Sequence, residues 1–266
     1  MPPEAHWTWC MFVEHAEEFA RLFFREEMML KGREQARQLK EIFHRFGVPD
    51  NGRVLDLCCG VGRHAIPLAE MGYSVVGVDL SEAYIQRARD LAAEKGLSGR
   101  AWFLIGDARR LPALLPAGGP LFDAVLNLGT AVGYFGEEGD VAMLSGARSL
   151  AEEGALLVVD TVNRDWIVAN FQPSHIVSLG QYEVHELREI DLLSSHLRVR
   201  WRFCERKEGY LEVRADVDTE IRLYSPHELL DLLRRSGWEP LGLYADLSLG
   251  ELKPLSRRLV ALARAA

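Results

Sequence analysis

The segment that most constrains this chain runs from Val54 to Ala65, with the sequence Val-Leu-Asp-Leu-Cys-Cys-Gly-Val-Gly-Arg-His-Ala. This pattern predicts a buried strand, followed by a glycine turn and then a helix. Gly60 permits the tight turn, and Gly62 lets the backbone approach a ligand. The helix beyond the turn points its free N–H groups at whatever binds there. The segment therefore predicts a ligand-binding site at the edge of a parallel α/β sheet.

Compact apolar runs alternate with helical segments from residue 53 onward. Strands are expected at 53–57, 74–79, 102–105, 122–127 and 155–161. Helices are expected between them, near 63–71, 82–95 and 138–149. A capped helix at 226–236 is followed by two last expected strands, at 238–244 and 257–262. This order favours βαβ units and a mostly parallel, doubly wound sheet of the Rossmann-like α/β class.

Two later segments, 196–203 and 211–223, alternate apolar and polar residues almost without error. Such alternation is typical of strands buried on one face, and 181–192 shows it more loosely. We expect two or three antiparallel strands inserted into the α/β domain. The charges on their polar face nearly cancel, so the arginines are expected to pair with acids across the strands. The residues concerned are Arg198, Arg200 and Arg202, with acids such as Glu212, Asp216 and Asp218.

The chain is expected to form one core with two elaborations. Its 266 residues, 48% of them hydrophobic, can bury a substantial core. Residues 14–46 hold no proline and only Gly32, which suits amphipathic helices. We therefore assign 1–46 to an N-terminal helical cap. The ligand-binding domain is assigned to 47–174 and 224–266, and the inserted antiparallel region at 175–223 to a lid.

Three acids at the ends of successive strands narrow the kind of ligand. Asp79 follows the glycines by about 20 residues, where a carboxylate can accept both hydroxyls of a ribose. The loop also fits the G-x-G-x-x-A form of dinucleotide sites, but Asp56 lies inside the strand before it, where it would repel a pyrophosphate and attract a cation. Asp107 can accept a hydrogen bond from an adenine amine. Together the acids suit a ligand with a cationic end, a ribose and an adenine.

At this point the sequence resembles the class I S-adenosylmethionine-dependent methyltransferases. The resemblance rests on LDLCCGVGRHA (55–65), VVGVDLS (75–81), GDARRLP (106–112) and FDAVLNLGTAVGYF (122–135), and covers roughly Leu39 to Ala263. It is closest to bacterial small-molecule-type methyltransferases with a G-x-G-R-H loop, many of which have no assigned substrate. The resemblance implies a seven-stranded sheet whose last strand is antiparallel. One departure is Cys58, which stands where the family has its first loop glycine.

The resemblance implies S-adenosylmethionine as cofactor and a set of cofactor-binding residues: Asp56, Gly60, Gly62, Arg63, Asp79, Leu80, Asp107, Ala108 and Asn127. Gly60 would face the methionine end of the cofactor, with Leu80 and Ala108 against the adenine ring. Arg63 would bind the cofactor from the start of the helix after the glycine loop. Asn127, which ends the fourth strand, would line the site beside the methionine moiety, where its backbone carbonyl or amide could hold the cofactor's amino group.

The expected reaction is methyl transfer to a small-molecule acceptor. The 31 Lys and Arg against 39 Asp and Glu give a net charge of −8, so no strong positive field is available for nucleic acid. An RNA or protein methyltransferase and a non-catalytic cofactor-binding protein remain the alternatives. No residue is assigned a catalytic role: His64 is interpreted as securing the loop or contacting the cofactor carboxylate rather than as a general base, and Tyr134 as contacting substrate or packing. Acceptor selection is expected from 7–24, 129–137 and the insertion.

The cysteines and histidines show no metal-ligand spacing, so no metal is expected. We expect a reduced, cytoplasmic protein that is a monomer or a homodimer. No stretch approaches the roughly 18 apolar residues of a membrane span, and the N-terminus lacks the features of a secretion signal. We therefore expect no membrane partner.

Overall fold

Seven strands form one sheet in the order β10-β11-β5-β4-β1-β2-β3 in the computed structural model, which describes residues 6–115, 119 and 121–266. The first five residues of the predicted cap lie outside the described residues. The strand bounds are β1 Arg53–Leu57, β2 Ser74–Asp79, β3 Ala101–Ile105, β4 Phe122–Asn127, β5 Ala151–Val162, β10 Trp238–Tyr244 and β11 Arg258–Ala265. Neighbours among the first five strands run parallel, whereas β11 runs antiparallel to both β5 and β10. The predicted Rossmann-like sheet with an antiparallel last strand is confirmed.

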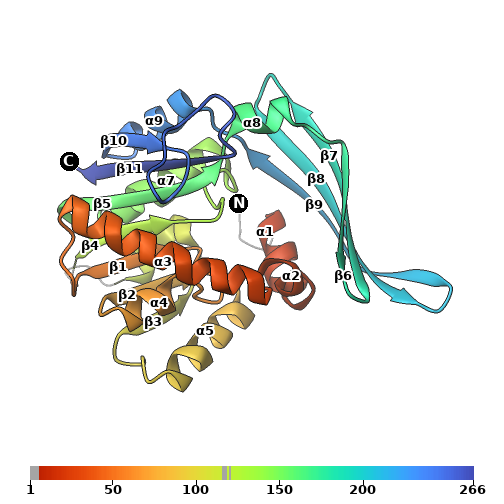
Figure 1. Ribbon diagram of the computed structural model, residues 1–266, viewed down its shortest axis with the longest axis horizontal. Coiled ribbons are helices and arrows are strands. Elements are labelled where there is room, and N and C mark those ends of the chain that lie inside the picture. The colour runs from red at the N-terminus through yellow and green to blue at the C-terminus, as the bar shows by residue number, and fades with distance from the viewer. Residues whose placement is uncertain (1–5, 116–118, 120) are drawn as a thin grey trace.

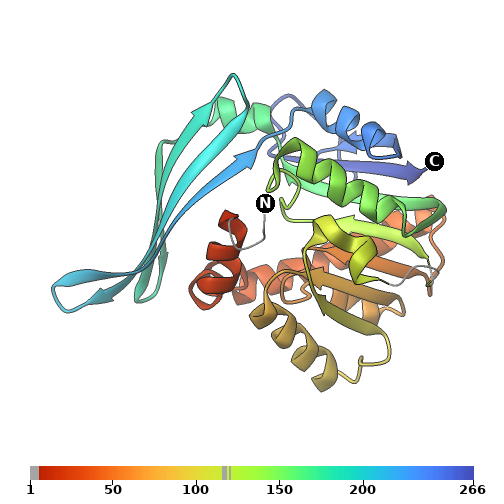
Figure 2. The same ribbon diagram turned by 180° about the vertical axis from the view of Figure 1, so that it is seen from behind.

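Helices cover both faces of this sheet, so the domain has three layers (Figures 1 and 2). One face carries α3 Glu26–Phe46, α4 Ala65–Glu70 and α5 Glu82–Glu94. The other carries α6 Leu111–Leu114, α7 Gly136–Arg148 and α9 Pro226–Arg235, with the short 3-10 helix η3 at Ala108–Arg110. The alternating apolar runs of the sequence become strands because each is buried between these two helical layers.

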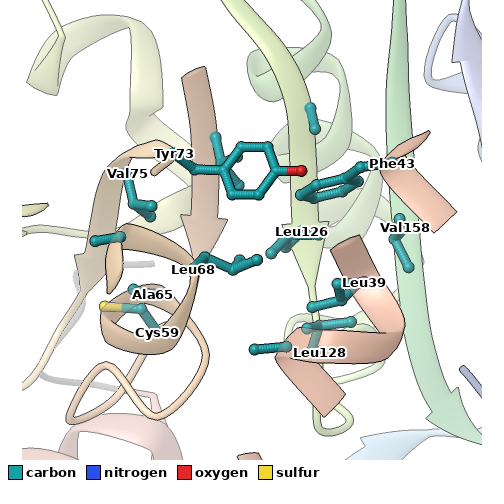
Figure 3. Packing of buried hydrophobic residues seen from close by; sticks show 14 of the residues in the cluster. Leu39, Phe43, Cys59, Ala65, Leu68, Tyr73, Val75, Leu126, Leu128 and Val158 are labelled. Carbon is teal, nitrogen blue, oxygen red and sulfur yellow. The ribbon is translucent and has the colours of Figure 1, made fainter. Parts of the chain in front are cut away.

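Helix α3 belongs to the core of the sheet domain and not to a separate cap. Its residues Leu39 and Phe43 are fully buried, and the Phe43 ring lies edge-on to Tyr73 at 5.2 Å between ring centres. Figure 3 shows the same side chains packed toward Leu126 and Val158 of the central strands. Their spacing places these apolar residues on one helix face, and burial of that face orders the helix against the sheet. The packing of α3 therefore gives no sign of a domain boundary at residue 46, where the sequence analysis placed the end of the cap.

The inserted sheet has four antiparallel strands in the order β6-β7-β8-β9. They are β6 Ser174–Leu179, β7 Tyr182–Asp191, β8 His196–Lys207 and β9 Tyr210–Arg222. The expectation of two or three strands is corrected, because β6 is a short edge strand with mostly exposed residues and gives no clear alternation. The predicted pairing of arginines with acids is found: Arg200 and Arg202 both pair with Asp216, at 2.8 and 3.0 Å, while Arg198 pairs with Glu220 at 2.7 Å.

Short helices near the N-terminus lie between the inserted sheet and the sheet domain (Figures 1 and 2). They are α1 Trp7–Trp9, the π-helix η2 Cys10–Glu14 and α2 Ala16–Phe23. Phe19 packs with Phe203 and Val217 of the inserted sheet. On its other side, α2 packs Ala20 against Tyr84 of the sheet domain. These helices are therefore held by both parts of the molecule.

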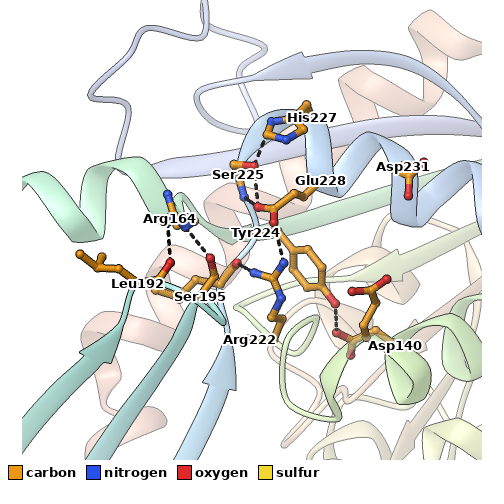
Figure 4. Close-up of polar contacts among 12 residues, drawn as sticks. Asp140, Arg164, Leu192, Ser195, Arg222, Tyr224, Ser225, His227, Glu228 and Asp231 are labelled. Carbon is orange, nitrogen blue, oxygen red and sulfur yellow. Dashed lines mark hydrogen bonds and ion pairs between the residues drawn. The ribbon is translucent and has the colours of Figure 1, made fainter.

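Polar contacts join the end of β9 to the sheet domain (Figure 4). Arg222 pairs with Glu228 at 2.6 Å, and Glu228 also accepts a hydrogen bond from the backbone N–H of Ser225 at 2.9 Å. This is the capping box expected at the start of helix α9. The Tyr224 hydroxyl donates to the buried carboxylate of Asp140 at 2.8 Å. The inserted sheet is thus anchored directly beside α7.

Candidate functional site

The loop after β1 adopts left-handed backbone conformations at three positions: Cys58 with φ 55°, Gly60 with φ 56° and Gly62 with φ 74°. The positive φ of Cys58 explains why the methyltransferases that this sequence resembles have glycine at this position, since residues with a side chain rarely adopt positive φ. A Cβ at Gly60 would lie 2.9 Å from a ring carbon of Phe24. Burial and the neighbouring acids raise the pKa of the Cys58 thiol well above its ordinary value, so the thiol stays protonated.

A cavity of about 200 Å³ opens where the carboxyl ends of β1 to β4 meet. Most of the predicted cofactor residues line it: Asp56, Gly60, Arg63, Asp79, Leu80, Asp107 and Ala108. Parallel strands bring their carboxyl ends to one edge of the sheet, and ligands bind where the strand order reverses, here between β1 and β4. The structure therefore gathers at one place the acids that the sequence placed at successive strand ends.

Two predicted residues, Gly62 and Asn127, do not line this cavity. A Cβ at Gly62 would lie 3.0 Å from ring carbons of Phe103, so the lack of a side chain there permits close packing on β3. Asn127 is fully buried, and its Oδ1 accepts a hydrogen bond from the N–H of Val132 at 3.1 Å. The residues that follow it, Leu128 and Gly129, line the cavity instead.

Asp56 carries a carboxylate oxygen that has no hydrogen-bond partner among the described residues. The residue is 1% exposed. Burial raises its pKa to about 7, although the charge of Arg63 opposes the rise, and the neighbouring Asp79 adds to it. A buried carboxylate with a free acceptor and a destabilised charge is suited to a cationic ligand group, which would restore the ionised form.

Asp79 accepts two backbone hydrogen bonds that close the loop around it. The N–H of Gly60 donates to Oδ2 at 2.8 Å, and the N–H of Ser81 donates to Oδ1 at 2.9 Å. Burial raises the pKa of Asp79, and these hydrogen bonds counteract part of the rise. Each carboxylate oxygen keeps a further acceptor position, so closure of the loop and binding of ribose hydroxyls are compatible.

Asp107 is held by Arg109 in a paired arrangement. Arg109 Nη2 lies 2.6 Å from Oδ2, and its Nε lies 2.9 Å from Oδ1. Partial burial raises the pKa of Asp107, but the hydrogen bonds and charge of Arg109 outweigh burial and hold the pKa below its ordinary value. The carboxylate is therefore ionised at neutral pH and able to accept a hydrogen bond from an amine. Arg109 also lies over the ring of Phe135, 4.8 Å from its centre.

Arg63 and His64 begin the segment after the glycine loop, and both line the cavity. Burial lowers the pKa of the Arg63 guanidinium, while the nearby acids Asp160 and Asp56 raise it. Arginine stays charged at neutral pH, so it brings one positive charge among the acids. His64 Nε2 lies 3.0 Å from Gln35 Oε1, and burial, aided by Arg63, lowers its pKa well below the ordinary value. A neutral histidine held this way fits the loop-securing interpretation.

A second part of the cavity lining, the aromatic wall, comes from the N-terminal helices, the start of α3 and the loop after β4. The lining residues of this wall are Phe12, Phe23, Phe24, Met28, Tyr134 and Phe135. The Tyr134 ring stacks on Phe12 at 5.9 Å and meets the edge of Trp7 at 4.9 Å. The segments 7–24 and 129–137 were expected to contact the acceptor, whereas Met28 and Arg109 were missed. No local pattern marks Met28, because only folding brings α3 to this edge.

A family model described as a methyltransferase domain matches residues 54–154, which span β1 to the start of β5. The chain is also 29% identical over 192 residues to the ubiquinone biosynthesis O-methyltransferase of Roseobacter denitrificans. That alignment covers 71% of this chain and 60% of the relative. Residues 54–154 therefore form a methyltransferase domain. The predictions of this enzyme class and of its cofactor are confirmed.

Solved structures share the fold of the methyltransferase domain and of much of the remaining chain. The CcbJ methyltransferase from Streptomyces caelestis has a TM-score of 0.74 and 23% sequence identity, covering 88% of this chain and 89% of that one. CalS10, an amino pentose methyltransferase from Micromonospora echinaspora solved with S-adenosylmethionine bound, has a TM-score of 0.63 and 20% identity. It covers 90% of this chain and 96% of its own. At these identities the likeness concerns the fold alone.

Proposed function

We propose that this chain transfers a methyl group from S-adenosylmethionine to a small, partly apolar acceptor molecule. The observation that carries the proposal is the asymmetry of the cavity. Its lining combines charged groups at the strand ends, which suit the cofactor, with aromatic side chains from the N-terminal helices and the loop after β4.

The residues of the sheet edge fit the polar groups of the cofactor. The free Asp56 oxygen would accept from the cofactor's amino group, and Arg63 would hold its carboxylate. Asp79 would accept the ribose hydroxyls. Asp107 would accept from the adenine amine, and the apolar surfaces of Leu80 and Ala108, which also line the cavity, would lie against the ring. When bound, the cofactor supplies a methyl group activated by its sulfonium.

The aromatic wall would orient the acceptor and exclude water. Methyl transfer is an in-line displacement with a good leaving group, so alignment can supply most of the acceleration. Rings such as Phe12 and Phe24 present flat apolar surfaces for an acceptor to lie against. The neutral His64 and the Tyr134 hydroxyl, whose pKa burial raises, both stay uncharged at pH 7. These properties favour an acceptor that loses its proton without a strong general base.

Two further observations support a small acceptor over a macromolecule. The net charge of −8 gives no general attraction for nucleic acid. Two similar proteins are named for small molecules, one for ubiquinone biosynthesis and one for an amino pentose.

We also propose that the chain belongs to the G-x-G-R-H subgroup, works in the cytoplasm and is a monomer or homodimer. Among the described residues, no helix is long and apolar enough to cross a membrane.

Incubation of the purified chain with methyl-labelled S-adenosylmethionine and a metabolite extract is expected to label a small molecule, because the aromatic cavity accepts one. The product is separated by mass and identified by chromatography with mass spectrometry. Label found only in RNA or protein, when those are added in parallel, would contradict the small-molecule acceptor. Cofactor binding with no labelled product in any fraction would favour a non-catalytic binding protein.

With the acceptor in hand, Tyr134→Phe is expected to lower kcat/KM for the acceptor by about tenfold, since one hydrogen bond is lost, and to leave cofactor affinity unchanged. The matched control is Tyr84→Phe. Tyr84 also lines the cavity, but its hydroxyl donates to the carbonyl of Ala16 at 3.0 Å and is unavailable to the acceptor. Steady-state kinetics with varied acceptor compare the two. Equal effects of both substitutions would argue against a role of Tyr134 in acceptor binding.

A further inference from the structure

The turn after β4 contains two successive residues in the left-handed region, Gly129 with φ 81° and Thr130 with φ 78°. Glycine adopts this conformation without cost. Threonine is branched at Cβ, and for such residues positive φ is a strained outlier that persists only when surrounding contacts enforce it. The contacts that hold Thr130 therefore determine the path of this turn.

Those contacts come from two strands on the far side of β4. Arg258 on β11 donates from Nη1 to Thr130 Oγ1 at 2.8 Å. The same guanidinium donates from Nε to Asp160 Oδ1 at 2.8 Å and from Nη2 to the Asp160 carbonyl at 3.0 Å. That carbonyl also accepts the N–H of Thr130 at 3.0 Å. Asp160 is 5% exposed. Arg258 thus holds the hydroxyl of Thr130 directly. It also holds the carbonyl of Asp160, which accepts the backbone N–H of Thr130.

The clamped turn forms part of the cavity at the methionine end. Gly129 lines the cavity together with Leu128 and Ala131, its neighbours in the turn. A Cβ placed on Gly129 would lie 2.9 Å from Nη2 of Arg63, so the Arg63 guanidinium rests directly on this backbone. A shift of Thr130 would move Gly129, and with it the surface that supports Arg63.

We propose that Arg258 is a positioning residue for the cofactor. Through Thr130 it holds the Gly129 backbone against Arg63, and so fixes the place where the cofactor carboxylate binds. The inference rests on the proposed function, which gives Arg63 that carboxylate. Arg258 lies on the last strand and does not line the cavity, so its contacts reach the site through this turn, while its charge also acts on Arg63.

Two substitutions of Thr130 separate the loss of its hydrogen bond to Arg258 from the loss of its backbone strain. Thr130→Val keeps the branched shape but loses the hydroxyl, whereas Thr130→Gly loses the hydroxyl together with the strain. Thr130→Val is expected to weaken the binding of S-adenosylmethionine and S-adenosylhomocysteine roughly 10-fold, because the strained turn relaxes once the hydrogen bond that enforces it is lost. Thr130→Gly is expected to stay within about twofold of the unmodified chain. Calorimetric titration gives each Kd.

A probe without the amino acid moiety tests whether the effect is local. 5′-Methylthioadenosine keeps the adenine and ribose but has no carboxylate, so Thr130→Val is expected to leave its Kd within about twofold. Arg258→Met is the second variant: it is expected to weaken S-adenosylmethionine roughly 10-fold in the unmodified chain and much less in the Thr130→Gly background.

Equal binding of S-adenosylmethionine by Thr130→Val and the unmodified chain would overturn the inference. Equal weakening of S-adenosylmethionine and 5′-methylthioadenosine would overturn it too, because that pattern indicates general damage to the site. An Arg258→Met effect that is the same in both backgrounds would show that Arg258 does not act through Thr130. Failure of the unmodified chain to bind S-adenosylmethionine would instead refute the proposed function itself.

Discussion

Asp79→Ala is expected to weaken the binding of S-adenosylmethionine by about 1.5–3 kcal/mol, the usual range for hydrogen bonds to a charged group. This corresponds to roughly a 10- to 150-fold rise in Kd. The substitution removes the carboxylate proposed to accept the ribose hydroxyls. It also releases the N–H groups of Gly60 and Ser81, which that carboxylate holds at 2.8 and 2.9 Å. Calorimetric titration of the purified variant measures the change.

Asp123→Ala is the matched control for Asp79→Ala. Asp123 also anchors a backbone N–H, that of Arg53, at 2.7 Å, but it lies near the start of β4, at the opposite edge of the sheet. Its removal is expected to leave the Kd for S-adenosylmethionine unchanged. An unchanged Kd in a folded Asp79→Ala chain would refute the ribose assignment. A loss of equal size in both variants would indicate general destabilisation of the sheet.

Asp56 is expected to make cofactor binding depend on pH near neutrality. Burial raises the pKa of its carboxyl to about 7, so below pH 7 the free protein holds a proton there. The cofactor's ammonium favours the ionised carboxylate, and binding must therefore release that proton. Affinity is expected to increase as pH rises through 7, with a loss approaching about tenfold for each pH unit below it. The sign follows because the bound state carries fewer protons than the free state.

Asp56→Asn keeps the shape of the side chain and removes the charge. It is expected to weaken S-adenosylmethionine at least about tenfold at pH 8 and to abolish the pH dependence between 5.5 and 8. Calorimetry at pH 6 in buffers of different ionisation enthalpy counts the protons released, about one for the unmodified chain and none for Asp56→Asn. Asp140, whose pKa burial also raises to about 7, lies outside the cavity lining. Undiminished proton release from Asp56→Asn would assign the titration to Asp140 instead.

The local pattern of the sequence predicts the sheet domain well. The strands ending at Leu57, Asp79 and Asn127 have the predicted carboxyl ends, since each apolar run is bounded by turn residues. The inserted region was found from its period-two alternation, which burial of one face imposes on any strand. Strand β6 was not predicted, because an edge strand with little burial carries no such alternation.

Roles within the site were predicted less completely. Asp56, Asp79 and Asp107 meet at one cavity as expected, because parallel topology places strand ends side by side. The backbone of Asn127 was predicted to contact the cofactor; its side chain accepts from the N–H of Val132, and the next residues, Leu128 and Gly129, line the cavity. The direction of a side chain at the end of a strand depends on how the following turn packs. No pattern of neighbouring residues encodes it.

The sequence by itself determined the order of elements, the glycine loop and the acids that face the cofactor. All of these depend on residues close together in the chain. Only the tertiary structure decided which distant segments complete the cavity. The aromatic wall joins the N-terminal helices to the loop after β4, and the strained Thr130 is held by Arg258, 128 residues away. Such contacts form when the two sides of the sheet domain and the insertion pack together, so their specificity lies in packing and hydrogen bonding across the fold.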